Sequence, residues 1–274
     1  MASLFVNIRE LWETTNKQEK TAELLRQAGQ REQALEAYRK CLAAREDLMR
    51  YDGQNLQCKA DLLVALEAVG EILAELGRPK EAADPYRRAV KLSAELADDI
   101  PTEIKLKFNA AKGHGRLAAI LTAIPDHAGA AKELAAERDI LNRLLDNHDK
   151  NNVAWLQELA ETYDNLGRAE AAAGRKDKAI GAYGCAVIIS DVLGAVEPDR
   201  LTWQKYRVFS RYHAAEAGDD PKRHLQQAHD IIRKLTIEQK LETKDLVGWV
   251  QMVEDAYAKA VPRPEFKPDP WPGR

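Results

Sequence analysis

The chain has 274 residues, of which 45% are hydrophobic, 6% aromatic and 31% charged. Its 41 Lys and Arg and 44 Asp and Glu give a formal net charge of −3, so no strong overall field draws it to nucleic acid or to an anionic membrane. The first residues lack the apolar core of a secretory signal, and no uncharged apolar run approaches the roughly 20 residues that span a bilayer. We therefore expect a protein that does not contact membranes.

The predicted secondary structure is helical throughout, because Ala and Leu dominate the apolar residues and favour helix over strand. The spacing of apolar residues and the Gly and Asp-Gly breaks predict helices, in chain order, over residues 3–28 (one long or two short), 31–51, 56–76, 79–97, 102–124, 126–147, 153–173, 176–196, 201–217, 221–235 and 245–261. Every connection is short, so consecutive helices are expected to be antiparallel neighbours.

The sequence also repeats itself. A Gly is followed after five residues by Ala, after four more by Tyr and after three more by a small residue, in the stretches 29–42, 77–90 and 174–187. A weaker copy starts at Pro125. The shared Ala positions are 34, 82, 130 and 179, which lie 48, 48 and 49 residues apart. A fixed period of this size indicates a stacked repeat protein. Gly29, Gly77 and Gly174 should end the first helix of each pair in a left-handed turn.

Within each repeat the residues resemble the tetratricopeptide repeat (TPR), which has small residues where its two helices cross and an aromatic residue in the second. The matching positions are Gly70, Leu73, Gly77, Ala82, Tyr86 and Ala89, and again Gly167, Gly174, Ala179, Tyr183 and Ala186. The resemblance covers about residues 17–220. The period of 48 exceeds the usual TPR period of about 34, and residues 151–167 look like the long repeats of bacterial arrays.

This resemblance implies an all-α fold. We expect a right-handed superhelical α-solenoid of antiparallel helix pairs, with about four to five repeats and a C-terminal capping helix. Residues 1–261 are expected to form this single solenoid. The family implies a non-catalytic scaffold or adaptor, with a regulatory role, that binds a partner protein or peptide in its concave groove.

In TPR proteins the first helix of each pair lines that groove. The corresponding candidates are an acidic stripe of Glu67, Glu71 and Glu75, a basic stripe of Lys105, Asn109, Lys112 and Arg116, and a mixed set of Glu161, Asp164 and Arg168. The Lys and Asn clamp with which some TPR domains hold chaperone C-termini is missing, so a partner of basic or mixed charge fits better. The alternative, ion pairs within the solenoid worth about 0–1 kcal/mol each, stays open.

Other function classes have weaker support in the sequence. An anion-binding or nucleic-acid-binding module on the basic helix 102–124 is the alternative, although a few basic residues on a net acidic chain disfavour nucleic acid. No phosphate loop, catalytic motif or clustered Cys and His is present, so we expect no enzyme, no cofactor and no metal. Three scattered cysteines favour a reducing, cytoplasmic location.

The last segment, residues 262–274, is a Pro-rich tail that cannot continue a helix. Its Phe266 and Trp271 are candidate anchors for a groove or for a partner's pocket, and a disordered tail is the other interpretation. Self-association also stays open, because Trp12 and Trp249 lie in the end repeats, whose outer faces can lack full polar caps.

Overall fold

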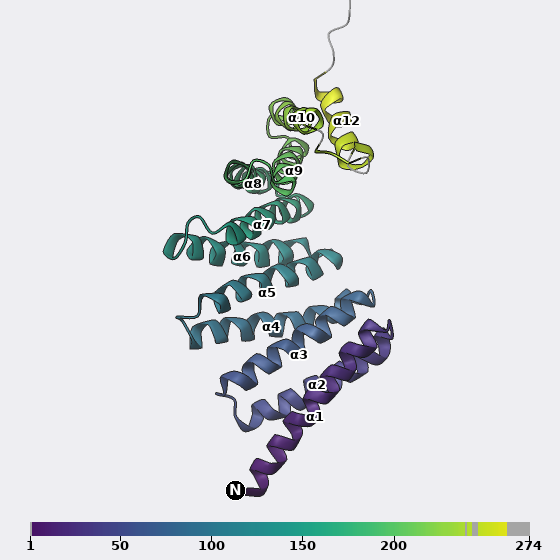
Figure 1. The fold of residues 1–274 in the computed structure, drawn as a ribbon, viewed down its shortest axis with the longest axis vertical. Coiled ribbons are helices and arrows are strands. Elements are labelled where there is room, and N and C mark those ends of the chain that lie inside the picture. The colour runs from purple at the N-terminus through teal and green to yellow at the C-terminus, as the bar shows by residue number, and fades with distance from the viewer. Residues whose placement is uncertain (1, 239, 243–245, 262–274) are drawn as a thin grey trace, which may run out of the picture. The chain divides into compact units, whose positions relative to one another are not determined.

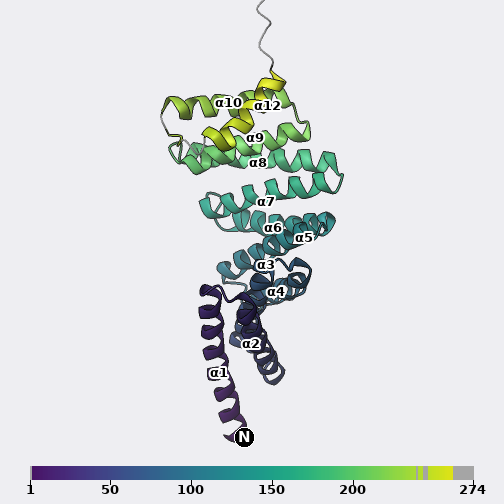
Figure 2. The same ribbon diagram turned by 90° about the vertical axis from the view of Figure 1, so that its right-hand side faces the viewer.

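The computed structural model describes residues 2–238, 240–242 and 246–261. It contains two compact units, Met1–Glu158 and Leu159–Arg274. All regular structure in these described ranges is helical, which confirms the all-α expectation. In unit 1 the consecutive helices α1 to α6 lie side by side and alternate in direction (Figure 1 and Figure 2).

The helix bounds agree closely with those predicted from the sequence. Unit 1 contains α1 (Ala2–Gln27), α2 (Arg31–Tyr51), α3 (Leu56–Glu75), α4 (Pro79–Asp99), α5 (Ile104–Ala123), α6 (His127–Asn147) and the start of α7 (Val153–Ala172). Unit 2 contains the rest of α7, α8 (Lys176–Val196), α9 (Leu201–Ala217), α10 (Pro221–Ile237), a π-helical turn η1 (Leu246–Val250) and α12 (Gln251–Ala260). We call the odd-numbered helices up to α9 the A helices and α2, α4, α6, α8 and α10 the B helices.

The expected closing helix over residues 245–261 is wrong in one respect. Gly248 has φ −93° and ψ −111°, which are not helical angles, so α12 begins only at Gln251. A residue without a Cβ tolerates such a break more readily than any other. Asp245 lies outside the described residues.

Three of the turns between paired helices have the predicted left-handed glycine. Gly29, Gly77 and Gly174 have φ values of 75°, 69° and 76°. At Gly174 the amide donates to the Ala171 carbonyl at 2.9 Å and the next amide, of Arg175, donates to Glu170 at 2.8 Å. Carbonyls left over at the helix end are thereby satisfied, as in a Schellman motif.

The repeated alanines are fully buried between packed helices. Ala34, Ala82, Ala130 and Ala179 each have a relative exposure of 0%. The B helices that carry them begin at residues 31, 79, 127 and 176, at intervals of 48, 48 and 49 residues. The alanine is therefore equally buried in each of these four repeats.

The repeated tyrosine packs against the glycine of its own A helix. A Cβ on Gly70 would lie 2.7 Å from the Tyr86 ring, and one on Gly167 would lie 2.5 Å from the Tyr183 ring. Tyr183 also reaches the next repeat, where it packs with Ala214 of α9. The aromatic ring thus fills space both within a repeat and between repeats, which explains the pairing of Gly with Tyr in the sequence pattern.

Among the described helices, α8 alone is long and apolar enough to cross a membrane by length and composition. One such helix is weak evidence for a membrane span, because the core helix of a packed protein has the same properties. In unit 2 this helix buries Ala179, Tyr183 and Leu193 and packs along α9.

Burial of the repeated tyrosines predicts a late alkaline titration. Burial raises the pKa of Tyr38, Tyr86 and Tyr183 to about 12. The folded state holds these protons more tightly than the unfolded state, so the contribution of these tyrosines to stability is fully present below about pH 10 and is lost between about pH 10 and 12. We expect three of the eight tyrosines to ionise about two pH units late in a titration followed at 295 nm. Ionisation of all eight near pH 10 in the folded protein would contradict this.

Candidate functional site

The predicted acidic stripe lies on α3, where ion pairs from α1 meet it. Arg26 Nη2 donates to Glu75 Oε1 at 2.5 Å, and Arg26 Nη1 donates to Glu71 Oε2 at 3.1 Å. Arg31, at the start of α2, lies 3.4 Å from the second oxygen of Glu75. Two of the three carboxylates are therefore partly neutralised from the preceding repeat, although their side chains stay 38% and 32% exposed.

The third carboxylate, Glu67, is paired from the opposite direction. Arg116 of α5 donates a hydrogen bond to Glu67 from the following repeat. The predicted acidic and basic stripes are thus brought together at this point, with Arg116 41% and Glu67 26% exposed. We call the side of α1, α3 and α5 that carries these pairs the A-helix face of unit 1.

The other members of the basic stripe lie closer to the start of α5. Lys105 and Asn109 are exposed, and Lys112 is partly exposed. The Lys112 ammonium lies 5.8 Å from the centre of the Phe108 ring, and that ring lies 6.5 Å from Trp155 at the start of α7. This part of the face combines positive charge with aromatic surface, a combination suited to binding an extended or helical segment.

The three candidates of the fourth repeat line one small pocket in unit 2. Ala160, Glu161, Asp164, Asn165 and Arg168 of α7, Ala186 and Ser190 of α8, and Tyr206 and Ser210 of α9 surround a volume of about 170 Å³. Arg168 lies 3.3 Å from Asp164, and its side chain is 60% exposed. The structure therefore brings Glu161, Asp164 and Arg168 together around one pocket.

This α7–α9 pocket is held together by bonds between consecutive A helices. The Tyr206 hydroxyl donates to Glu161, and His213 Nδ1 lies 2.6 Å from Asp164 Oδ1. The His213 ring lies 5.7 Å from the Tyr183 ring and 6.3 Å from Phe209. Hydrogen bonds and packed aromatic rings thus connect the polar side chains of the pocket to α8 and α9.

Sequence reasoning missed Arg26, Tyr206 and His213 as members of these faces. A signal was available, since the paired residues lie close to one repeat apart: residues 26 and 75, 67 and 116, and 164 and 213 are each separated by 49 positions. Opposite charges at a separation equal to the period indicate contacts between equivalent helix positions.

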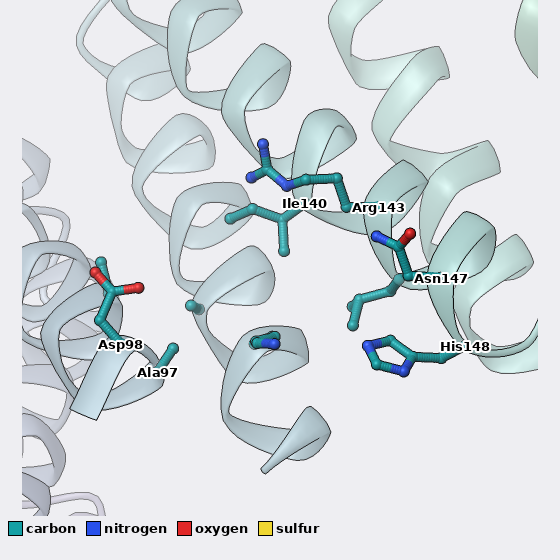
Figure 3. Close-up of a pocket in the computed structure, with 10 residues that line it drawn as sticks. Ala97, Asp98, Ile140, Arg143, Asn147 and His148 are labelled. Atoms are coloured by element: carbon teal, nitrogen blue, oxygen red, sulfur yellow. The ribbon is translucent and has the colours of Figure 1, made fainter. Parts of the chain in front are cut away.

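A second pocket, in unit 1, contains none of the predicted site residues. It has a volume of about 360 Å³ and lies between the end of α4, the start of α5 and the end of α6. Figure 3 shows Ala97 and Asp98 on one side of it and Ile140, Arg143, Asn147 and His148 on the other. Its lining combines apolar side chains of Ala, Ile and Leu with the charged Asp98, Lys107 and Arg143.

The described residues give no indication of metal chemistry, because no group of three His, Cys, Asp or Glu side chains could hold an ion there. His229, for example, lies 2.8 Å from Glu254 and stacks on Tyr257 with ring centres 4.3 Å apart. Among the cysteines, Cys41 is buried, and burial raises the pKa of its thiol to about 11. The predicted tail anchors Phe266 and Trp271 lie outside the described residues.

Comparisons with known proteins agree with the fold. Among solved structures, the nearly identical TPR-like repeats of a Podosopora anserina protein named as a kinesin light chain share 16% identity at a TM-score of 0.53, over 90% of this chain and 97% of that one. MamA shares 19% identity at a TM-score of 0.51, over 84% of this chain and 97% of that one. The apo form of RapI shares 12% identity at 0.51, over 91% and 82% of the two chains. A search of curated proteins found no match.

A family comparison matches residues 22–48 to the tetratricopeptide repeat. These residues cover the end of α1 and most of α2, the first repeat with the Gly, Ala and Tyr pattern. The same pattern packs helix on helix in the later repeats, as described above for Gly70 with Tyr86 and Gly167 with Tyr183. Residues 22–48 therefore match a tetratricopeptide repeat, and the described part of the chain has a TPR-like fold.

Proposed function

We propose that this protein is a non-catalytic scaffold that binds a partner protein or peptide through its A helices and has a regulatory role in the cytoplasm. The observation that supports this most is the ordered array of charged side chains on the A helices. The pairs formed by Glu67, Glu71, Glu75 and Arg116 join neighbouring repeats, and these side chains stay partly exposed, so little side-chain entropy is lost when a ligand binds. Arg116 and Glu71 combine such a bond with exposures of 41% and 38%.

The partner that fits this array has mixed charge. Glu67, Glu71 and Glu75 offer carboxylate oxygens beside Arg26 and Arg116, and the start of α5 offers Lys105 and Lys112 beside Phe108. An amphipathic helix or an extended segment with both lysines and carboxylates could bond to both groups. A strongly basic or strongly acidic partner would leave part of the array unmatched.

Charge reversal on α3 tests this proposal. We expect the variant with Glu67→Lys and Glu71→Lys to lose at least tenfold of the affinity for a partner that copurifies with the wild-type protein, because the reversed charges repel what the carboxylates attracted. A Glu67→Gln and Glu71→Gln variant removes the charge without reversing it and should lose less. Affinity is measured by titrating the purified partner.

The matched control reverses two carboxylates on outer B-helix faces. Glu36 pairs with Lys40 on α2 and Glu95 with Lys91 on α4, both well exposed. Lysine at both positions should leave partner affinity within twofold of wild type. If the α3 variant folds normally and binds the partner as tightly as this control does, binding through the A-helix face of unit 1 is excluded.

The alternative function, anion or nucleic-acid binding by α5, is less well supported by the geometry. Four Lys and Arg residues lie on α5. Arg116 already bonds to Glu67, and Lys107 lines the pocket between α4 and α6, which leaves Lys105 and Lys112. Two lysines neutralise too few phosphates for appreciable affinity at physiological salt. Salt-sensitive binding of a fluorescent single-stranded RNA, lost on Lys105→Glu with Lys112→Glu, would favour this alternative over the scaffold.

A further inference from the structure

The outward side of α8 is apolar over almost its whole length. Ile188, Val192 and Val196 have relative exposures of 66%, 45% and 56%, and they follow one another at steps of four residues. Four small residues complete this face, which we call the α8 patch: Gly181, Gly184, Cys185 and Ala195. Residues at these spacings lie on one side of a helix and form a continuous strip.

The other B helices provide an internal comparison, because the repeat gives the equivalent positions. Where α8 has Gly181, Ile188 and Val192, α2 has Glu36, Ala43 and Asp47, α4 has Asp84, Lys91 and Glu95, and α6 has Lys132, Asp139 and Arg143. Eight of these nine side chains are charged. A charged outer face is therefore what a B helix of this protein has when it faces water, and α8 departs from it.

The fold does not require this departure. The inward side of α8 already buries Ala179, Tyr183, Ala186 and Leu193. Ile188, Val192 and Val196 point away from that core and contribute little to it at their exposures. A contiguous exposed apolar strip on a water-soluble repeat, as opposed to scattered single residues, marks an interaction surface.

We propose that the α8 patch binds a second copy of this chain, with the two α8 helices antiparallel about a twofold axis at Ile188. The order of side chains along the patch supports this arrangement. Its first half is small and its second half is branched, so a twofold axis at Ile188 places Gly181 opposite the partner's Ala195 and Gly184 opposite the partner's Val192. Small residues of one copy then pack against bulky residues of the other on both sides of the axis, as an isologous interface requires.

The charges at the ends of α8 agree with antiparallel pairing. The first turn has Lys176, Asp177 and Lys178, with a net charge of +1, and the residues after the helix include Glu197, Asp199 and Arg200, with a net charge of −1. This distribution opposes the helix dipole within one copy, and an antiparallel neighbour compensates it. The ends are exposed, so they contribute orientation more than affinity.

The size of the patch sets the expected strength of the dimer. The exposed residues between Gly181 and Val196 offer roughly 400 Å² per copy, so two patches bury about 800 Å² together, less than the roughly 1,200 Å² of a standard stable interface. We therefore expect a reversible dimer with a dissociation constant in the micromolar range, which forms at high local concentration.

Sedimentation velocity between 5 and 200 µM protein tests the dimer. The wild-type chain should shift from monomer toward dimer over this range. A variant with Ile188→Lys and Val192→Glu has the residues that α4 uses at the equivalent positions, Lys91 and Glu95, and should fold normally. Its dissociation constant should rise at least tenfold. The control Asp139→Lys changes the charge at the position of α6 equivalent to Ile188 and should leave dimerisation unchanged.

Cysteine crosslinking tests the axis. In a chain with Cys41→Ala, Cys58→Ser and Cys185→Ser, the added substitution Ile188→Cys should give a disulfide-linked dimer under mild oxidation, because the two copies of this position meet at the axis. The matched substitution Lys91→Cys on α4 should not.

Three results would overturn the proposal. The first is a wild-type chain that stays monomeric at 200 µM; if a chain ending at Val261 then dimerises, the tail of residues 262–274 occupies the patch instead. The second is an Ile188→Lys, Val192→Glu variant that dimerises as well as wild type. The third is binding of the wild-type chain, but not of that variant, to vesicles of phosphatidylcholine and phosphatidylglycerol. This result would assign the patch to a membrane surface.

Discussion

Replacing Arg45 with alanine is expected to lower the free energy of unfolding by about 3 kcal/mol, since breaking a buried ion pair leaves an uncompensated charge. The Arg45 side chain is 5% exposed and lies at the junction of three helices. Its Nη1 donates to Asp61 Oδ2 at 2.7 Å on α3, and its Nη2 donates to Asn16 Oδ1 at 2.5 Å on α1. The substitution removes both bonds and leaves Asp61, 16% exposed, with a partly buried charge.

A matched control is available on the same helix. Arg39 also forms an ion pair, with Glu81 at 3.3 Å, but both side chains are about half exposed. Arg39→Ala should therefore change stability by less than about 0.5 kcal/mol. Urea denaturation followed by circular dichroism measures both variants. Equal midpoints for the two variants would show that the Arg45 junction does not stabilise unit 1.

Enlarging Ala179 to leucine is expected to destabilise unit 2 by about 2 kcal/mol through overpacking. Ala179 has no exposed surface and lies in a cluster with Tyr183 and Ala214. The added atoms must displace the Tyr183 ring, which itself fills the space opposite Gly167. Because the ring also touches α9, the strain affects the joint between two repeats.

The control for this second substitution is Ala43→Leu on α2. Ala43 is exposed, so the same added atoms meet water and stability should change by less than about 0.5 kcal/mol. The melting temperatures of the two variants are compared by circular dichroism. A variant at residue 179 that melts with the wild type would mean that the repeat register assigned to Gly174–Val187 is incorrect.

Much of the fold could be predicted from the sequence because the packing residues repeat. The Gly, Ala and Tyr pattern places Ala34, Ala82 and Ala179 in the core and Gly77 and Gly174 in left-handed turns, and the structure has them there. These residues are constrained by contacts between neighbouring helices, which are close in sequence. Local pattern and tertiary position therefore carry the same information.

The site was harder to predict because the partner of each surface charge belongs to the neighbouring repeat. The placement of Glu67, Glu71 and Glu75 on one side of a helix follows from the helical period alone. Their bonds to Arg26 and Arg116 depend on the separation of successive A helices, which local spacing does not give. The interruption at Gly248 likewise required knowledge of how α12 packs on α10.

The bonds between equivalent positions of neighbouring A helices also have a mechanical consequence. The ion pairs of Arg26 with Glu75 and of Arg116 with Glu67 resist separation of the helices they join in unit 1. Their strength falls as dissolved ions screen them, over a length of about 8 Å at physiological salt. The stiffness of unit 1 should therefore fall as the salt concentration rises. A ligand that binds Arg26 in place of Glu75 would weaken the contact between α1 and α3 while it gains an ion pair of its own.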